Sequence, residues 1–214
     1  MEIFFWSDYA CPYCYIGETN LKAALRELGV DCTPEMRAFE LSPDAPRSCP
    51  GPTSDLVAKK YGLSPEQAEA SMQRVNEMAA DAGLYFDFGK TRFTGTFDAH
   101  RLTKLARSRG PATADALEEA LFEAGFCQGL ELADREVLLA AARSAGLNED
   151  EVLALLDSDA FADEVRSDED LAHRAGVGGV PYFVIDRQYA IPGAMGKAQF
   201  IGVLRRIIAE EAGE

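Results

Sequence analysis

The sequence contains few basic residues and no long apolar run. Its 214 residues include 21 Lys and Arg against 36 Asp and Glu, which gives a net charge of −15 at pH 7. Most of this negative charge lies in residues 115–170, where 17 acidic residues stand against three basic ones. Such a surface repels phosphate backbones and anionic lipid, and no segment approaches the roughly 20 apolar residues of a membrane helix. We therefore expect neither nucleic acid nor a membrane as a partner.

The sequence also lacks a basic region followed by a cleavable apolar run at its N-terminus, and it shows no internal repeat or low-complexity segment. Residues 2–6 are instead typical of a first β-strand, which starts almost at the first residue. From this pattern we expect a cytoplasmic protein. The length and the hydrophobic content of 47% suit one large domain, or a domain that carries a sizeable insertion.

Cysteine and histidine are too few and too scattered for a disulfide framework or a zinc site. The five cysteines are Cys11, Cys14, Cys32, Cys49 and Cys127. An odd number in a reducing compartment argues against structural disulfides, and only Cys11 and Cys14 are closely spaced. A structural zinc site usually needs two close pairs, whereas His100 and His173 lie far apart. We expect no metal, and we interpret the histidines and the three isolated cysteines as ordinary helix or core residues.

The two ends of the chain carry the patterns of β-strands mixed with helices. At the N-terminal end the predicted elements are a strand over 3–6, a helix over 14–28, a strand over 36–41 and a proline-rich linker over 41–53. At the C-terminal end they are strands over 180–186 and 188–191 and a closing helix over 197–211.

Between these ends every predicted element is a helix. The predicted helices span 64–82, 97–109, 113–126, 134–145, 148–156 and 159–175. Ser64, Pro65 and Gln67 form a typical helix start, with a capping serine, a proline in the first turn and a glutamine three residues after the serine. We predict that residues 43–176 form an inserted helical subdomain and that residues 1–42 and 177–214 form one α/β domain. The order β-α-β and then β-β-α is the layout of the thioredoxin fold, so we expect that fold with a large all-helical insertion.

The closely spaced cysteines form the stretch CPYC between the first predicted strand and the first predicted helix. Cys11 would lie at the helix N-terminus, where unpaired N–H groups and the helix dipole favour a thiolate. Pro12 suits the first helical turn, because its missing N–H is harmless there. Cys14 would lie one turn further in, where it can attack a mixed disulfide on Cys11. This context predicts a redox-active dithiol.

A second motif is the stretch GVGGVPYFVI at residues 176–185, in which a proline follows glycines and opens an apolar strand. In thioredoxin folds a cis-proline stands at this point and packs against the active-site cysteines. We therefore expect a cis peptide bond between Val180 and Pro181, with Pro181 close to Cys11.

Four stretches together resemble the DsbA-like thioredoxin family, and specifically its cytoplasmic FrnE-type branch. They are FFWSDYACPYCYIGETNL near the N-terminus, TFDAHRL at 96–102, DREVLLAAARSAGL at 134–147 and RAGVGGVPYFVI at 174–185. The resemblance covers nearly the whole chain and implies a dithiol-disulfide oxidoreductase. It implies that Cys11 is the nucleophile, Cys14 the resolving cysteine and Pro181 the cis-proline.

The same resemblance implies substrate contacts and partners. Pro12, Tyr13 and Val180 are expected to contact the substrate. The expected partners are protein or small-molecule thiols and disulfides, with glutathione as a candidate co-substrate and no metal or organic cofactor. The electron partner and the direction of electron flow stay open, and so does the choice between a monomer and a homodimer.

Two alternative functions remain at this point. The same fold branch contains 2-hydroxychromene-2-carboxylate isomerases and kappa-class glutathione transferases, which usually carry serine where Cys11 stands. The first alternative is therefore a glutathione-dependent isomerase or transferase, and the second is a dithiol chaperone that binds unfolded chains. Cys14 favours redox chemistry, because an isomerase has no use for a second cysteine.

Overall fold

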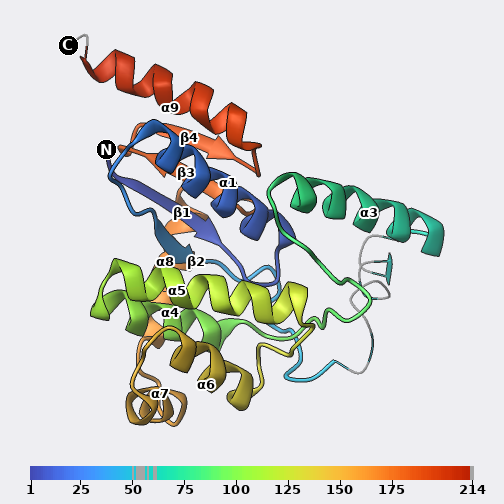
Figure 1. Cartoon of the computed structure of the whole chain (residues 1–214). Helices are drawn as coiled ribbons and strands as arrows, with labels where there is room; N and C mark the ends of the chain where they lie inside the picture. Colours follow the sequence, from blue (N-terminus) through green and yellow to red (C-terminus); the bar gives the residue numbers. More distant parts are fainter. Residues whose placement is uncertain (50, 52–55, 57, 60–61, 213–214) are drawn as a thin grey trace.

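A computed structural model describes residues 1–49, 51, 56, 58–59 and 62–212 of the chain (Figure 1). A mixed four-stranded sheet lies among its helices, in the order β2-β1-β3-β4. The strands are β1 (Ile3–Ser7), β2 (Glu35–Ala38), β3 (Tyr182–Ile185) and β4 (Tyr189–Pro192). β2 runs parallel to β1, whereas β3 is antiparallel to β1 and β4 is antiparallel to β3. One sheet thus joins the two ends of the chain, with Ile3 opposite Ile185.

Helices cover both faces of this sheet. They are α1 (Pro12–Leu28), α8 (Ala162–Arg174) and α9 (Lys197–Ala212). Successive side chains of a strand point to opposite faces, so Phe5 joins the core beneath α1 and α9, whereas Trp6 packs with Ala172 of α8. The indole Nε1 of Trp6 also donates a hydrogen bond to the carbonyl oxygen of Asp168 at 2.9 Å. In Figure 1, α1 and α9 lie together above the sheet and α8 lies behind it.

The middle of the chain is helical, as predicted. Its elements are α3 (Pro65–Asp81), α4 (Phe97–Arg109), α5 (Pro111–Phe122), a π-helical turn η1 (Glu123–Cys127), α6 (Arg135–Ser144) and α7 (Glu149–Leu156). The predicted start of α3 is confirmed. The backbone N–H of Gln67 donates to Ser64 Oγ at 3.2 Å, and the backbone N–H of Ser64 donates to Gln67 Oε1 at 2.9 Å.

Two predicted helix boundaries in this block are wrong. The helix expected from residue 113 begins two residues earlier at Pro111, and its last turn widens into the π-helix. The helix expected from residue 159 begins at Ala162, because Phe161 adopts a left-handed backbone conformation with φ of 62°. Hydrophobic periodicity detects neither a π-turn nor a left-handed residue, so both differences escape a sequence-based prediction.

The predicted elements at the two ends of the chain are correct in type and are displaced by a few residues. α1 begins at Pro12 rather than at Cys14. The strand expected over 36–41 ends at Ala38, since the N–H of Leu41 turns away from the sheet and donates to Asp8 Oδ2 at 2.7 Å. Part of the predicted linker lies outside the described residues.

The hydrophobic core runs without a break from the sheet into the helical block. One cluster contains Phe5 of β1, Leu21 of α1, Leu117 of α5 and Val152 of α7. The exact division into residues 1–42 with 177–214 and residues 43–176 stays a prediction. No helix in the described part of the chain is long and apolar enough to span a bilayer.

Candidate active site

Cys11 lies at the N-terminus of α1, directly after the turn that follows β1. It has an extended backbone and is the N-cap residue of the helix, with Pro12 in the first turn. Its N–H donates to the carbonyl oxygen of Asp8 at 3.0 Å, and its own carbonyl accepts from the N–H of Cys14 at 3.0 Å. Only 4% of Cys11 is exposed. The strand and the helix together hold its thiol in the positive end of the helix dipole.

Cys14 lies one helical turn deeper and is completely buried. Burial raises the pKa of its thiol well above the ordinary value, and a hydrogen bond with the Cys11 side chain raises it further. Its Sγ accepts a hydrogen bond from the backbone N–H of Asp8 at 3.5 Å. Both cysteines are free thiols in this structure. Cys14 is therefore an inaccessible thiol with a raised pKa, one turn behind Cys11, which suits a resolving partner.

The loop before β3 brings Val180 and Pro181 to the Cys11 thiol, although they lie about 170 residues away in the chain. Cys11 Sγ donates to the carbonyl oxygen of Val180 at 3.5 Å. The Val180–Pro181 peptide bond is cis, the geometry expected from the sequence. The carbonyl oxygen of Pro181 accepts from the N–H of Gly193 at 2.8 Å, which ties the loop to the end of β4.

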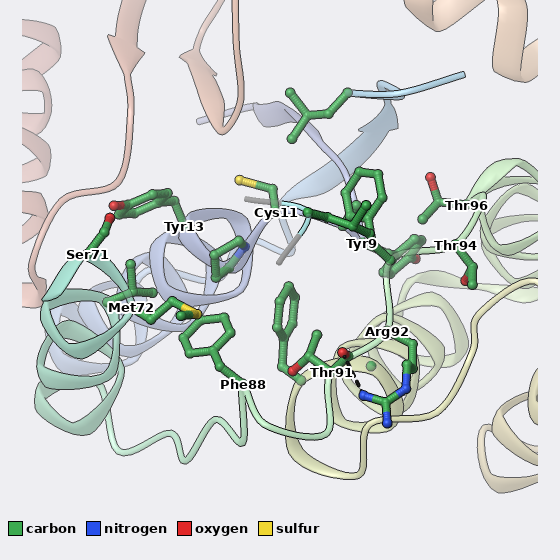
Figure 2. A pocket seen from close by; sticks show the side chains of 18 of the residues that line it. Tyr9, Cys11, Tyr13, Ser71, Met72, Phe88, Thr91, Arg92, Thr94 and Thr96 are labelled. Carbon is green, nitrogen blue, oxygen red and sulfur yellow. Dashed lines mark hydrogen bonds between the residues drawn. The ribbon is translucent and has the colours of Figure 1, made fainter. Parts of the chain in front are cut away.

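A cavity of about 660 Å³ opens beside Cys11 (Figure 2). Its volume lies within the range of roughly 300–1,000 Å³ that is usual for small-molecule sites. Its walls come from the turn before α1, from α3, from the segment 88–96 and from the π-helical turn. Its apolar lining side chains include Tyr9, Tyr13, Met72, Phe88, Phe93 and Phe126. The N-terminal end of α1 therefore faces a partly open, mostly apolar cavity.

The residues predicted to bind substrate occupy two places. Pro12 and Tyr13 line the cavity, and 39% of Tyr13 is exposed. Val180 lies outside the cavity lining and reaches the site through its carbonyl oxygen, which contacts Cys11. The geometry thus groups all the predicted residues around one thiol, while their roles in binding stay a prediction.

Asp8 is a buried residue of the site that the sequence analysis missed. Its Oδ1 accepts from Thr96 Oγ1 at 2.7 Å and lies 3.5 Å from His100 Nε2, and its Oδ2 accepts from the N–H of Leu41. Asp8 and His100 are each 1% exposed. The sequence did contain a clue to this contact. Asp8 stands three residues before Cys11, and Thr96 and His100 both belong to the TFDAHRL stretch.

The isolated cysteines lie outside the cavity lining. Cys32, Cys49 and Cys127 are free thiols, and burial raises the pKa of Cys32 and of Cys127. His173 lies against the ring of Phe39, with 6.0 Å between the ring centroids. None of these residues takes part in the Cys11 site as the described part of the chain shows it.

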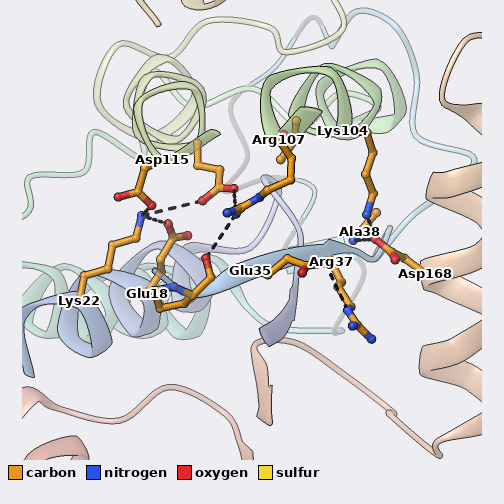
Figure 3. A network of polar contacts seen from close by, with 12 residues as sticks. Glu18, Lys22, Glu35, Arg37, Ala38, Lys104, Arg107, Asp115 and Asp168 are labelled. Carbon is orange, nitrogen blue, oxygen red and sulfur yellow. Dashed lines mark hydrogen bonds and ion pairs between the residues drawn. The ribbon is translucent and has the colours of Figure 1, made fainter. Parts of the chain in front are cut away.

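A group of carboxylates lies between α1 and the helical block (Figure 3). Glu18, Asp115 and Glu118 have oxygens within 4.8 Å of one another, a spacing that can hold a metal ion. The ammonium group of Lys22 already lies among them, 2.5 Å from Glu18 and 2.6 Å from Asp115. Arg107 Nη2 contacts Glu118 at 3.2 Å from the other side. The group therefore links helices through ion pairs around its own cation.

Comparison with known proteins gives a consistent result. The family model of the DSBA-like thioredoxin domain matches residues 2–204. A crystal structure described as a "probable DsbA oxidoreductase" from Streptomyces coelicolor has a TM-score of 0.90 and 36% identity, covering 98% of this chain and 91% of that chain.

Two other similar structures share the fold at low sequence identity. A 2-hydroxychromene-2-carboxylate isomerase has a TM-score of 0.70 at 15% identity, covering 100% of this chain and 98% of that chain. The cytosolic disulfide reductase DsbM from Pseudomonas aeruginosa has a TM-score of 0.65 at 16% identity, covering 98% and 99%, and it has also been solved with GSH. The family match extends over nearly the whole chain, and the chain belongs to the DsbA-like thioredoxin family.

Proposed function

We propose that this protein is a cytoplasmic thiol-disulfide oxidoreductase in which Cys11 exchanges with substrate and Cys14 resolves the mixed disulfide. The observation that carries the proposal is the asymmetry of the two thiols. Cys11 lines the cavity at a helix N-terminus, whereas Cys14 is completely buried and has a raised pKa. This asymmetry supports a division of roles in which Cys11 meets the substrate and Cys14 reacts second.

In the reducing direction the Cys11 thiolate attacks one sulfur of a substrate disulfide. A bond forms between Cys11 Sγ and that sulfur, the substrate S–S bond breaks, and the other half leaves as a thiolate. The thiolate of Cys14 then attacks Cys11 Sγ, which releases the second half of the substrate as a thiol. The substrate gains two electrons and the protein dithiol becomes a disulfide. In the oxidising direction a substrate thiolate attacks the same disulfide at Cys11.

The resolving step needs Cys14 to lose its proton inside the protein. The backbone N–H of Asp8 points at Cys14 Sγ and can stabilise negative charge there. Once Cys11 is part of a mixed disulfide, it no longer has a thiol that can share a hydrogen bond with Cys14. One cause of the raised pKa of Cys14 is thereby removed. Formation of the mixed disulfide therefore favours ionisation of Cys14 relative to the reduced protein, while burial, the largest cause of its raised pKa, remains.

Pro12, Tyr13 and Val180 are the residues we propose for contact with the substrate. The carbonyl oxygen of Val180 already accepts a hydrogen bond from Cys11, so it occupies the place where a substrate backbone N–H can bind beside the thiol. Protein disulfides and small-molecule disulfides are both candidate substrates. Glutathione is a candidate co-substrate, in keeping with the GSH-bound structure of DsbM.

Single-turnover kinetics test this function. The reduced protein is mixed with 4,4′-dithiodipyridine, and the released thiopyridone is followed by absorbance. In the fast phase we expect wild type to release two equivalents with formation of an intramolecular disulfide, and Cys14→Ser to release one and retain a mixed disulfide visible by mass spectrometry. Cys11→Ser should lose the fast phase, which leaves only the slower reaction of Cys32, Cys49 and Cys127. A fast phase that survives in Cys11→Ser would refute the assignment.

The same variants separate the alternatives. A glutathione-dependent isomerase or transferase keeps its activity in Cys14→Ser and requires glutathione. A dithiol chaperone suppresses aggregation of an unfolded protein in wild type and in Cys11→Ser alike, without turnover of a disulfide. Loss of the second equivalent in Cys14→Ser, with no requirement for glutathione, supports the oxidoreductase.

A further inference from the structure

The cavity beside Cys11 is the part of the site whose chemistry can identify a class of substrate. The chain carries 36 Asp and Glu, yet no acidic residue is among the described residues that line the cavity. Its charged lining residues are Arg74 of α3 and Arg92 of the segment before α4. In a protein with a net charge of −15, the described lining of this cavity therefore carries only positive charge.

Arg92 has hydrogen-bonding capacity left for a ligand. Its Nη1 donates to the carbonyl oxygens of Gly89, Lys90 and Thr91, which fixes the side chain against its own loop. Its Nε and Nη2 make no hydrogen bond or ion pair with any described residue. A guanidinium with two free N–H groups on one edge is suited to a carboxylate. In Figure 2, Cys11 lies on one side of the cavity and Arg92 on the other.

Aromatic rings form part of the wall of the same cavity. Tyr9, Phe88 and Phe126 line the cavity. The rings of Phe88 and Phe126 meet edge to face with 6.4 Å between their centroids, and Phe86 packs against both from behind. A flat apolar group gains most from such walls.

We propose that the preferred substrate is a disulfide that carries an apolar, preferably aromatic, body and a carboxylate, with the carboxylate bound by Arg92 and one sulfur facing Cys11. This inference rests on the function proposed above and names the substrate class of the same site. The reaction is the exchange already described: Cys11 Sγ bonds to one sulfur of the substrate, the other half leaves as a thiolate, and Cys14 completes the two-electron reduction.

The test compares three probes in single-turnover reactions of the reduced protein. They are 5,5′-dithiobis(2-nitrobenzoate), which is aromatic and anionic; 4,4′-dithiodipyridine, which is aromatic and uncharged; and glutathione disulfide, which is anionic and has no aromatic group. The measured quantity is the ratio of rate constants between probes, because leaving-group effects are the same in every variant and cancel when variants are compared.

Arg92→Gln should lower the ratio of the anionic to the uncharged aromatic probe about tenfold, the effect of losing one charge-assisted hydrogen bond. Arg92→Lys should restore part of that ratio. Arg205→Gln is the matched control, because it removes the same charge from an exposed position on α9 outside the cavity and should leave the ratio unchanged. Phe88→Ala should lower the ratio of the aromatic anionic probe to glutathione disulfide. Circular dichroism checks that each variant is folded.

The outcomes separate this inference from the proposed function. The carboxylate site is overturned if the ratio of rate constants for the anionic and the uncharged aromatic probe is unchanged in Arg92→Gln, or if it falls equally in Arg205→Gln. Neither result contradicts the proposed oxidoreductase function. A ratio that Phe88→Ala does not change overturns the aromatic part. Absence of any Cys11-dependent reaction with all three probes overturns the proposed function as well.

Discussion

At the scale of single residues, Cys14 is the most perturbed thiol of the site. Because burial raises its pKa well above the ordinary value, it stays protonated at a pH where a free cysteine is ionised. In a Cys11→Ser variant we expect iodoacetamide to alkylate Cys14 far more slowly than a free cysteine of pKa about 8.5. Mass spectrometry of the peptide that contains Cys14, sampled across pH 7 to 10, measures this rate. Alkylation of Cys14 at the rate of a free cysteine would contradict the buried environment.

The residues of the site were predictable from the sequence where they form a local motif. Cys11, Pro12 and Cys14 are adjacent to a strand end and a helix start, so their geometry follows from local structure. The cis bond before Pro181 was predictable because thioredoxin folds carry a cis-proline before this strand. No local motif points to Arg92. It joins the site only because the folded chain brings the segment before α4 and the start of α1 to the same cavity.

At the scale of elements, the packing of α1 on β3 depends on Gly17. A Cβ atom added to Gly17 would lie 3.0 Å from Cζ of Phe183 and 3.3 Å from Cγ of Pro181. Phe183 cannot easily move, because it is completely buried and packs against Phe5 and Phe200. We therefore expect Gly17→Ala to lower the free energy of unfolding, by about 1–3 kcal/mol as in overpacked cores. The rate of Cys11 with disulfides should fall too, because Pro181 is displaced.

A second helical glycine provides the control for that prediction. Gly202 of α9 is exposed and has no atom within 4 Å of an added Cβ. Gly202→Ala should stabilise the protein by about 0.5–1 kcal/mol, through helix propensity alone. Urea denaturation of both variants gives the comparison. Equal stabilisation by the two substitutions would show that α1 is not tightly packed on β3.

The group of carboxylates between α1 and the helical block should make stability depend on pH, because its buried member Glu118 is protonated while Glu18 and Asp115 pair with Lys22. Glu118 is completely buried, and burial raises its pKa to about 8, with Glu18 and Asp115 adding to the shift while Lys22 and Arg107 oppose it. Between about pH 5 and 8 the folded state therefore holds a proton that the unfolded chain has lost. The free energy of unfolding should fall as pH rises through this range.

Glu118→Gln should remove that dependence, because a neutral amide replaces the protonated carboxyl. We expect the difference in unfolding free energy between pH 5 and pH 8 to shrink by on the order of 1–3 kcal/mol relative to wild type. Glu69→Gln, on the exposed face of α3, should leave the wild-type slope intact. Parallel curves for wild type and Glu118→Gln would mean that Glu118 is ionised throughout this range.

Whether a segment forms a helix or a strand was predictable, because this depends on local patterns. The residues at which helices and strands begin and end were harder to predict. The capping box at Ser64 fixed the start of α3, since every group involved is within three residues. The end of β2 depends on Asp8, which lies about 30 residues away and captures the N–H of Leu41. Long-range contacts of this kind decide boundaries without leaving a pattern in the nearby sequence.

At the scale of the whole molecule, the sheet and the helical block share one core. Trp6 of β1 is the only tryptophan of the chain, and it donates a hydrogen bond to Asp168 of α8. α8 in turn contacts both β2 and α4, and Lys104 of α4 forms an ion pair with Asp168. Loss of the sheet would therefore expose apolar surface on the helices that surround it, and loss of the helices would uncover both faces of the sheet.

This continuity predicts one cooperative unfolding transition, despite a chain length at which separate steps are common. Fluorescence of Trp6 reports on the sheet, whereas circular dichroism at 222 nm reports mainly on the helices. In urea the two signals should give the same midpoint and the same slope. Trp6→Phe provides the control for the fluorescence signal and should keep the transition seen by circular dichroism close to that of wild type. Two separate midpoints would mean that the inserted helices fold as an independent domain, and the cavity beside Cys11 would then lie between two units able to open without unfolding.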